Sequence, residues 1–304
     1  MAESNLKLKS VPAGRRHPPW LKVRLPTLES YSNMKALIKD ASTNTVCEEA
    51  KCPNIGECWS HGTATFMILG DTCTRACRYC HVKTGWPGGI LKNSDEPKQV
   101  AEAVKKLGLK YVVITSVDRD DLDDGGSSIF AKTIDEIHEV SSASVEVLTP
   151  DYTGGNLKRI IDSKPEVYGH NIETVRRVFK DVRSKGDYDK SLSILLQAKK
   201  LNPKQKTKTA LMVGLGETSD EIIETMKDLR KHEVDFLAIG QYLRPTKKHV
   251  ELVKYYTPQE FVEFARIGKE LGFLHVEAGP LVRSSYRADK INKFLSLNKL
   301  KIIN

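Results

Sequence analysis

The sequence predicts an α/β fold in which six β/α units form a partial (β/α)₆ TIM-type barrel. Two observations carry this prediction: short apolar, strand-like runs recur along the chain, and amphipathic helical stretches separate them. Strands that alternate with helices imply a parallel sheet with right-handed crossovers. The six strands are expected at residues 65–69, 110–115, 144–148, 166–170, 208–213 and 235–239.

The segments between these strands have the periodicity of amphipathic helices. We expect helices at residues 96–107, 129–140 and 219–232, with Ser219 as the N-cap of the last one. Residues 273–277 read as a further strand that would extend the sheet. Because the active sites of such barrels lie at the carboxyl ends of the strands, the residues directly after each strand are the candidates for function.

We divide the chain into an N-terminal extension (residues 1–60), the barrel (61–280) and a C-terminal segment (281–304). A chain of 304 residues, 39% hydrophobic and 29% charged, can bury a substantial core. No apolar stretch approaches the ~20 residues that cross a bilayer, and the start lacks the apolar region of a secretory signal. Six cysteines are too few for a disulfide scaffold. We therefore expect a cytoplasmic protein in a reducing compartment, with no membrane partner.

The net charge of +9 is concentrated at the two ends of the chain. Residues 1–24 and residues 283–304 each carry +5, so the 258 residues between them sum to −1. Three explanations stay open: general solubility, a nucleic-acid-binding surface, and docking of an acidic protein partner. No nucleic-acid-binding motif accompanies the basic ends, so we expect no nucleic-acid partner.

Six cysteines in two triads carry the chemical signal. The first triad is Cys47, Cys52 and Cys58, spaced C-x4-C-x5-C, and the second is Cys73, Cys77 and Cys80, spaced C-x3-C-x2-C. Three thiolates close in sequence can hold three irons of a 4Fe-4S cluster and leave the fourth iron open to a substrate. The alternative is zinc, because His61 or His81 could complete a Cys₃His site. Zinc sites usually pair two short knuckles, however, and neither triad has a matching second knuckle.

The second triad follows the first predicted strand, and Tyr79 precedes its last cysteine. This spacing, with an aromatic residue at that position, resembles the radical S-adenosylmethionine superfamily. The resemblance implies that the second triad binds a catalytic 4Fe-4S cluster whose open iron chelates S-adenosyl-L-methionine. It also implies that electron transfer to the sulfonium releases a 5′-deoxyadenosyl radical, and that Tyr79 packs near the adenine. The family often has phenylalanine at this position.

The first triad narrows the resemblance. Residues 47–59 are similar to the auxiliary-cluster signature of the lipoyl synthases, and six further blocks match that family in order. These blocks are residues 70–75, 115–122, 170–175, 211–218, 240–246 and 283–286. The resemblance spans roughly residues 20–290, and its seven blocks lie between residues 47 and 286. The resemblance therefore covers most of the chain and implies two 4Fe-4S clusters.

The resemblance also implies cofactor contacts at the strand ends. The expected residues are Tyr79, Thr115, Ser116, Asn171, Glu173, Gly214, Gly216 and Gln241. Those after the second strand would bind the methionine amino group, those after the fourth the ribose hydroxyls, and the glycines after the fifth would let the backbone approach adenine. Each position also has a simpler explanation, such as a strand cap, a helix-dipole partner or a tight turn. We interpret the charged residues 118–121 as a loop with a structural and gating role.

Ser285, in the segment Arg283-Ser284-Ser285-Tyr286, matches by its position the serine that completes the auxiliary cluster in the lipoyl synthases. The resemblance implies that it is the fourth ligand beside the first triad and that it takes part in catalysis, as the second triad does. A serine alkoxide binds iron less well than a thiolate, which suits a ligand that must leave when the cluster is attacked. The alternative is a hydroxyl that only ties the segment to the barrel.

The activity that the resemblance implies is that of a lipoyl synthase, a sulfurtransferase. Two sulfur atoms would enter at C6 and C8 of an octanoyl group on a lysine of a lipoyl carrier domain, with the auxiliary cluster as donor. The implied partners are the carrier domains of 2-oxoacid dehydrogenase E2 or of the glycine cleavage H protein, an electron donor such as ferredoxin or flavodoxin, and an iron–sulfur carrier. The alternative is another sulfur-inserting enzyme of the superfamily, such as a methylthiotransferase. Such an enzyme would spread its extra triad over a separate domain, whereas here the first triad occupies only residues 47–58.

Overall fold

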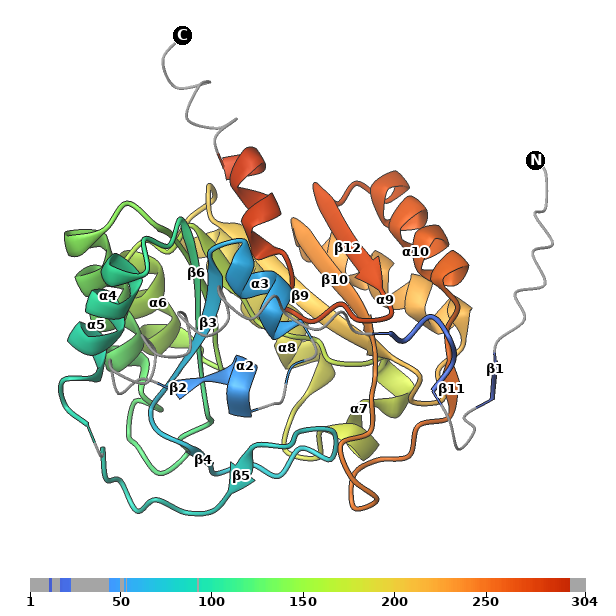
Figure 1. The fold of residues 1–304 in the computed structure, drawn as a ribbon, viewed down its shortest axis with the longest axis horizontal. Helices are drawn as coiled ribbons and strands as arrows, with labels where there is room; N and C mark the ends of the chain where they lie inside the picture. Colours follow the sequence, from blue (N-terminus) through green and yellow to red (C-terminus); the bar gives the residue numbers. More distant parts are fainter. Residues whose placement is uncertain are drawn as a thin grey trace, which may run out of the picture.

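The computed structural model describes residues 11–12, 17–22, 44–49, 52, 54–91 and 93–295 of the chain. Its centre is a sheet with the strand order β12-β10-β9-β8-β7-β6-β3-β2 (Figure 1). The parallel strands are β3 (Thr63–Ile68), β6 (Tyr111–Ser116), β7 (Ser144–Leu148), β8 (Val167–Gly169), β9 (Lys206–Val213), β10 (Phe236–Gln241) and β12 (His275–Gly279). The short β2 (Asn44–Thr45) pairs antiparallel with β3. Among the described residues no pairing joins β12 back to β3, which confirms the partial barrel and adds β12 as a seventh parallel strand.

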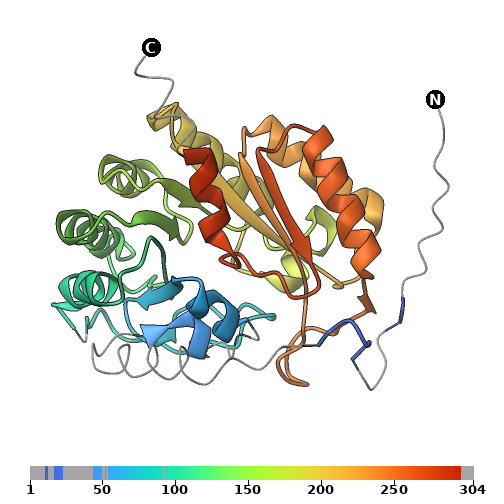
Figure 2. The same ribbon diagram turned by 45° about the horizontal axis from the view of Figure 1, so that its top comes forward.

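Seven helices of seven or more residues, in the part of the chain that the structure describes, cover the outer face of the sheet (Figure 2). They are α4 (Glu96–Lys106), α5 (Ser127–Val140), α6 (Gly154–Asp162), α7 (Arg176–Val182), α8 (Tyr188–Leu201), α9 (Ser219–Lys231) and α10 (Pro258–Glu270). Their apolar sides face the sheet, as with the fully buried Phe130, Ile134 and Ile137 of α5. The remaining short elements are β1 (Val11–Pro12), α2 (Val46–Glu49), α3 (Ile55–Ser60), β4 (Thr72–Cys73), β5 (Lys83–Thr84), β11 (Lys254–Tyr255) and η1 (Ala288–Ile291).

The start of α9 corrects one prediction. Its N-cap is Thr218, not Ser219: the Thr218 hydroxyl accepts a hydrogen bond from the backbone N–H of Glu221, at 3.2 Å. The Glu221 carboxylate in turn accepts from the backbone N–H of Thr218, at 2.8 Å. With Thr218 as the N-cap, Glu221 occupies the third helical position, which it would not do with Ser219 as the N-cap. The two hydrogen bonds satisfy two otherwise free backbone N–H groups, and this favours Thr218 over Ser219.

Strand alternation separates the outer core from the barrel interior. On β10, Leu237 and Ile239 join the large core under the helices, while Phe236 and Ala238 belong to two smaller clusters with the C-terminal segment. One of these clusters holds Tyr111, Val113, Val167 and Phe236 against Ala288 and Ile291. The C-terminal segment therefore fills part of the barrel interior.

A buried polar network fills the same end of the barrel. The ammonium group of Lys208 lies 2.7 Å from Oε1 of Glu146, and the Tyr111 hydroxyl donates to the other carboxylate oxygen at 2.6 Å. All three side chains are buried, and an isolated charge there would be costly. Here the Lys208 ammonium and the Tyr111 hydroxyl both bond to the Glu146 carboxylate, so neither buried charge is left without a partner.

The C-terminal segment also crosses the open side of the barrel. Tyr286 donates from its hydroxyl to Glu57 of α3 at 3.0 Å, and Asn54 donates from its amide to the carbonyl oxygen of Leu281 at 2.6 Å. In Figure 2 this segment (red) lies between β12 and the blue elements that include α3. The division of the chain at residues 60 and 280 stays a prediction. Both extensions pack directly on the barrel.

Gly240 of β10 makes room for this crossing. A Cβ atom at Gly240 would lie 2.0 Å from the carbonyl oxygen of Val282, whose side chain packs on Ala210 and Ala238. Small residues on these two strands therefore let the backbone of the C-terminal segment approach the sheet closely.

We expect Gly240→Ala to destabilise the fold by about 1–3 kcal/mol, because the Val282 backbone must move away. Gly155→Ala on α6 is the matched control, since a Cβ atom there meets nothing within 4 Å. Chemical denaturation of both variants measures the effect. Equal midpoints for the two variants would contradict the close approach.

Candidate active site

The loop after β3 carries the second triad and is held at both ends. The guanidinium of Arg119 donates to the carbonyl oxygens of Leu69, at 3.1 Å, and Ile90, at 2.9 Å. Its charge is paired with Asp121, whose carboxylate also accepts from the backbone N–H of Gly89 at 2.8 Å. Both side chains are almost fully buried. Within residues 118–121, Arg119 and Asp121 thus clamp the loop, while a gating role stays a prediction.

All three cysteines of the second triad line one cavity of about 180 Å³ at the carboxyl ends of β3, β6, β7 and β8. Its other lining residues are Arg75, Tyr79, Val82, Thr115, Ser116, Val117, Asp118, Leu148, Thr149, Pro150, His170, Asn171, Glu173 and Arg183. Five of the eight predicted cofactor residues therefore meet the second triad in one place. They are Tyr79, Thr115, Ser116, Asn171 and Glu173.

The chemistry of the three thiols fits a metal cluster. Backbone N–H groups of Arg75 and Asp118 donate to Sγ of Cys73 at 3.4 and 3.3 Å, which favours a thiolate. Burial is the main cause that raises the pKa of Cys77 to about 12 and of Cys80 to about 11. Free thiols here hold their protons, so the binding of iron must release them.

Two cavity residues offer groups suited to a polar ligand. The Ser116 hydroxyl is buried and has no hydrogen-bond partner among the described residues, so it is available to a bound molecule. Glu173 has a φ of 66°, a left-handed conformation that is held by backbone hydrogen bonds to Ala210 and Met212 of β9 at 3.0 and 2.8 Å. Burial raises the pKa of Glu173, while hydrogen bonds from Asn171 and Tyr79 oppose this shift. Thr115 instead donates to the carbonyl oxygen of Leu148, at 2.9 Å.

The structure places Gly214, Gly216 and Gln241 outside the lining of this cavity. The amide nitrogen of Gln241 donates to the carbonyl oxygens of Val213, at 3.0 Å, and Lys254, at 3.1 Å, and its amide oxygen accepts from a backbone N–H. A Cβ atom on Gly214, whose φ is 109°, would lie 2.3 Å from that same amide nitrogen. Their cofactor contacts stay predictions, and their visible role is to pack the turn after β9.

Sequence reasoning missed an ion network on one wall of the cavity. Asp151 pairs with Arg183 at 2.8 Å and with Arg75, and lies 3.3 Å from Nε2 of His170. Burial opposes its ionisation, but His170, Arg183 and Arg75 hold the pKa of Asp151 at about 2. Burial, and then Arg183, lower the pKa of His170 to about 4, so its imidazole is neutral at pH 7. Asp151 follows a strand and was findable by that rule, whereas Arg183 follows α7 and was not.

The first triad lies on α2, α3 and the segment between them. The backbone N–H of Cys52 donates to the carbonyl oxygen of Cys47 at 2.9 Å. Burial, with a contribution from Cys52, raises the pKa of Cys47 to about 11. Burial likewise raises the pKa of Cys58 to about 12, and the nearby Cys52 and Cys47 add to it. The three thiols are thus close enough to influence one another.

The turn that carries Ser285 comes to this triad. The backbone N–H of Arg287 forms a hydrogen bond with Cys58, and the charge of Arg283 opposes the effect of burial on the pKa of Cys52. Ser285 lies between these two residues, and its carbonyl oxygen accepts from the N–H of Ala288 at 3.4 Å. A fourth ligand from this turn stays a prediction. Among the described residues, no three His, Cys, Asp or Glu side chains form a set around a single metal ion.

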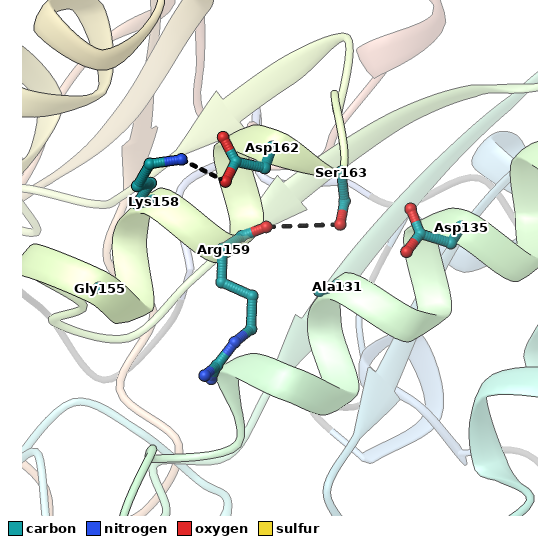
Figure 3. A pocket seen from close by; sticks show the side chains of 7 residues that line it. All are labelled: Ala131, Asp135, Gly155, Lys158, Arg159, Asp162 and Ser163. Atoms are coloured by element: carbon teal, nitrogen blue, oxygen red, sulfur yellow. Dashed lines mark hydrogen bonds and ion pairs between the residues drawn. The ribbon is translucent and has the colours of Figure 1, made fainter.

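A second hollow, of about 480 Å³, lies between α5 and α6 (Figure 3). Three of its four charged side chains form ion pairs: Lys158 pairs with Asp162 at 2.6 Å, and Arg159 with Asp124 at 3.1 Å. No cysteine lines it. In the part of the chain that the structure describes, no helix has the length and apolar character of a membrane span.

A partial parallel barrel with three cysteines in the loop after its first strand defines a radical S-adenosylmethionine enzyme. The family model of the radical SAM superfamily matches residues 67–229. Methylornithine synthase shares the fold with a TM-score of 0.56 at 11% identity, over 79% of this chain and 67% of that one. The hydrogenase maturase HydG of Carboxydothermus hydrogenoformans does so with a TM-score of 0.55 at 15% identity, over 83% and 72%. A 4Fe-4S cluster and S-adenosylmethionine are the cofactors of this superfamily.

The particular family follows from closer relatives. The model for the N-terminal domain of lipoyl synthase matches residues 2–52. Lipoyl synthase of Rubrobacter xylanophilus is 54% identical over 274 residues, covering 89% of this chain and 85% of that protein. Lipoyl synthase of Halalkalibacterium halodurans is 53% identical over 279 residues, covering 90% and 91%. The chain belongs to the lipoyl synthase family, whose members are sulfurtransferases that act on octanoylated lipoyl carrier proteins.

Proposed function

We propose that this enzyme inserts two sulfur atoms, at C6 and C8 of an octanoyl group on a lysine of a carrier domain. The sulfur donor is an auxiliary 4Fe-4S cluster held by Cys47, Cys52, Cys58 and Ser285. The observation that supports this most directly is that the turn at residues 283–287, which carries Ser285, meets the first triad through Arg283 and Arg287. The second triad, in its own cavity, serves as the site of the radical cluster.

When bound at the second triad, the cluster and S-adenosylmethionine supply a radical able to take hydrogen from an unactivated carbon. The protein's part is to hold and orient. The unpartnered Ser116 hydroxyl is suited to the methionine end of the cofactor, and Asn171 and Glu173 to the ribose hydroxyls. The charged wall of Arg75, Asp151 and Arg183 fixes the side of the cavity next to Cys77.

Ser285 has a second part to play in this scheme. Oxygen is a poorer ligand for iron than sulfur, so Ser285 would hold an auxiliary cluster less firmly than the three thiolates and would be the ligand that gives way, while the cluster would supply the sulfur. Each new C–S bond replaces one C–H bond, and the hydrogen leaves on 5′-deoxyadenosine. Two S-adenosylmethionine molecules therefore yield two methionines and two 5′-deoxyadenosines for each lipoyl group.

The proposal includes the carrier, electron-donor and iron–sulfur-carrier partners that the resemblance implies. The acyl group arrives on the lipoyl domain of a 2-oxoacid dehydrogenase E2 component or on the glycine cleavage H protein. Ferredoxin or flavodoxin is suited to deliver the electron that each cofactor cleavage needs, and an iron–sulfur carrier to restore the auxiliary cluster after turnover.

Mass spectrometry tests this function directly. We expect an octanoylated lipoyl-domain peptide to gain two sulfur atoms when incubated with reconstituted enzyme, S-adenosylmethionine and reductant, because both sites are then loaded. The 5′-deoxyadenosine formed should be twice the lipoyl product. A reaction without S-adenosylmethionine is the control. Formation of 5′-deoxyadenosine with no sulfur on the peptide would contradict the proposal.

A further inference from the structure

Three loops meet beside the second triad: the loop after β3 that carries the triad, the loop between β10 and β11, and the segment after α7. The loop between β10 and β11 reaches it, since Nε2 of His249 lies 2.9 Å from the carbonyl oxygen of Cys80 and the N–H of Val250 donates to the carbonyl oxygen of Arg78 at 2.9 Å. The segment after α7 joins from the other side, because the N–H of Arg78 donates to the carbonyl oxygen of Val182 at 3.0 Å. In Figure 1 the first of these loops (orange) lies beside β5.

Five exposed cations project from these loops. We call them the basic rim. Its members are Arg78, Lys185, Arg244, Lys247 and Lys248. The rim borders the cavity of the second triad, because Cys77, Cys80 and Arg183, which line this cavity, lie in the same loops or in contact with them.

No rim cation forms an ion pair with a carboxylate in the described part of the chain, although Arg75 and, more weakly, the charge of Lys185 lower the pKa of Asp120. Arg78 donates to the carbonyl oxygen of Asp181 at 2.9 Å, Arg244 to those of His249 and Lys247 at 2.9 and 2.7 Å, and Lys185 reaches a carbonyl oxygen at 3.5 Å. A backbone carbonyl orients a cation but leaves its full charge. Three exposed carboxylates lie nearby, Asp181 at the end of α7, Asp187 in the segment after it and Glu251, so the five cations outnumber the anions.

Three exposed arginines on the outer helices are paired with carboxylates. On the outer helices, Arg176 pairs with Asp189 at 2.8 Å, Arg177 with Glu221 at 2.7 Å and Arg266 with Glu263 at 2.6 Å. Lysines without an ion pair among the described residues occur on the helices too, such as Lys98 on α4 and Lys132 on α5. The rim differs because its five cations lie on loops that meet where the cavity opens. Such a local field attracts an anionic partner and raises its rate of encounter.

We propose that the basic rim is the docking surface for an acidic face of the carrier domain, around the lysine that bears the acyl group. This inference rests on the proposed function, which requires a protein-bound acyl chain to enter the cavity beside the rim. The rim lies in the barrel, apart from the basic ends of the chain. Nucleic acid is the other class of anion that could bind here. It is disfavoured because the lipoyl synthases act on a protein carrier, and it is included below as an outcome of the test.

The test compares two double variants with the same charge change. Lys247→Glu/Lys248→Glu alters the rim, where no hydrogen bond of either side chain supports the fold among the described residues. Lys98→Glu/Lys132→Glu alters two exposed lysines on α4 and α5 and is the control. The affinity of each holoenzyme for the intact octanoylated carrier domain is measured without reductant, so that no turnover occurs. Turnover of a short neutral octanoyl-lysyl peptide is measured separately.

We expect the rim variant to bind the carrier about tenfold more weakly at low salt, with the difference shrinking as salt screens the charges. Its turnover of the short peptide should equal that of the wild type, and the control should resemble the wild type in both assays. Replacing acidic residues around the acylated lysine of the carrier by lysine should restore binding to the rim variant.

Equal carrier affinity for the two variants would overturn the proposal, as would displacement of the carrier by single-stranded RNA at similar concentrations. Failure of the proposed function gives a different result. In that case the wild type adds no sulfur to the short peptide, whatever the rim does, while carrier binding is still measurable.

Discussion

Alanine at any one of Cys73, Cys77 and Cys80 is expected to abolish formation of 5′-deoxyadenosine. All three side chains line the same cavity, and a cluster held by three protein ligands loses its fixed position when one is removed. Chromatography of the reaction mixture measures the nucleoside. Nucleoside at wild-type level from any of these variants would contradict the assignment of the radical site.

The variants of the other triad are the matched control for this prediction. Alanine at Cys47, Cys52 or Cys58 should leave cofactor cleavage at least partly intact but stop sulfur insertion, because these residues lie on α2, α3 and the segment between, outside the cavity. Iron content should fall from about eight to about four per chain in either set, since each cluster holds four irons. Lipoyl product from a variant of this set would show that the sulfur comes from elsewhere.

Ser285→Ala is expected to keep cofactor cleavage and to lose lipoyl formation. The serine lies between Arg283, which interacts with Cys52, and Arg287, which interacts with Cys58. Ser285 does not line the cavity of the second triad. The measurement is the ratio of lipoyl product to 5′-deoxyadenosine, which should collapse while the nucleoside persists. Ser284→Ala, one position earlier in the same turn, is the control.

Ser285→Cys separates ligation from a merely structural role. A thiolate binds iron more tightly than an alkoxide, so this variant should retain its auxiliary cluster and stall before the second sulfur enters. Mass spectrometry would then show substrate with one sulfur. If Ser285 only tied the turn to the barrel, alanine would lower stability and leave the product ratio at the wild-type value.

Much of the fold was readable because the barrel repeats one local pattern. The six predicted strands each overlap an observed strand, and the run at residues 273–277 became β12. Alternating apolar strands and amphipathic helices carry their own period, which needs no long-range information. The boundaries moved by a few residues, as at β3, which begins at Thr63 and ends at Ile68.

The site was readable where function follows strand order and less so elsewhere. Tyr79, Ser116 and Glu173 line the cavity because they follow the first, second and fourth predicted strands. Gln241 also ends a strand, yet its side-chain amide donates hydrogen bonds to the backbone carbonyl oxygens of Val213 and Lys254. Contacts of that kind depend on how loops fold over one another, and no local sequence pattern predicts them.

Charge was the least readable property. The 258 residues between the basic ends sum to −1, and this total conceals the unpaired cations of Arg78, Lys185 and the loop at residues 244–248. These positions lie far apart in sequence and become one surface only when three loops converge. A sum over the chain cannot separate a cation paired with a carboxylate, such as Arg176, from one that is not.

The contact between Tyr286 and Glu57 joins residues 229 positions apart, and this sets an order of events during synthesis. Partners of the second triad such as Asp118, 45 positions from Cys73, leave the ribosome early, and Arg183 completes that cavity. The 283–287 turn emerges about 100 residues later, roughly 5–20 s at ordinary translation rates. A nascent chain can therefore form the cavity of the second triad first. The first triad meets the 283–287 turn only when translation is nearly finished. Under the proposed function, factors that deliver iron and sulfide would thus meet two sites that mature at different times.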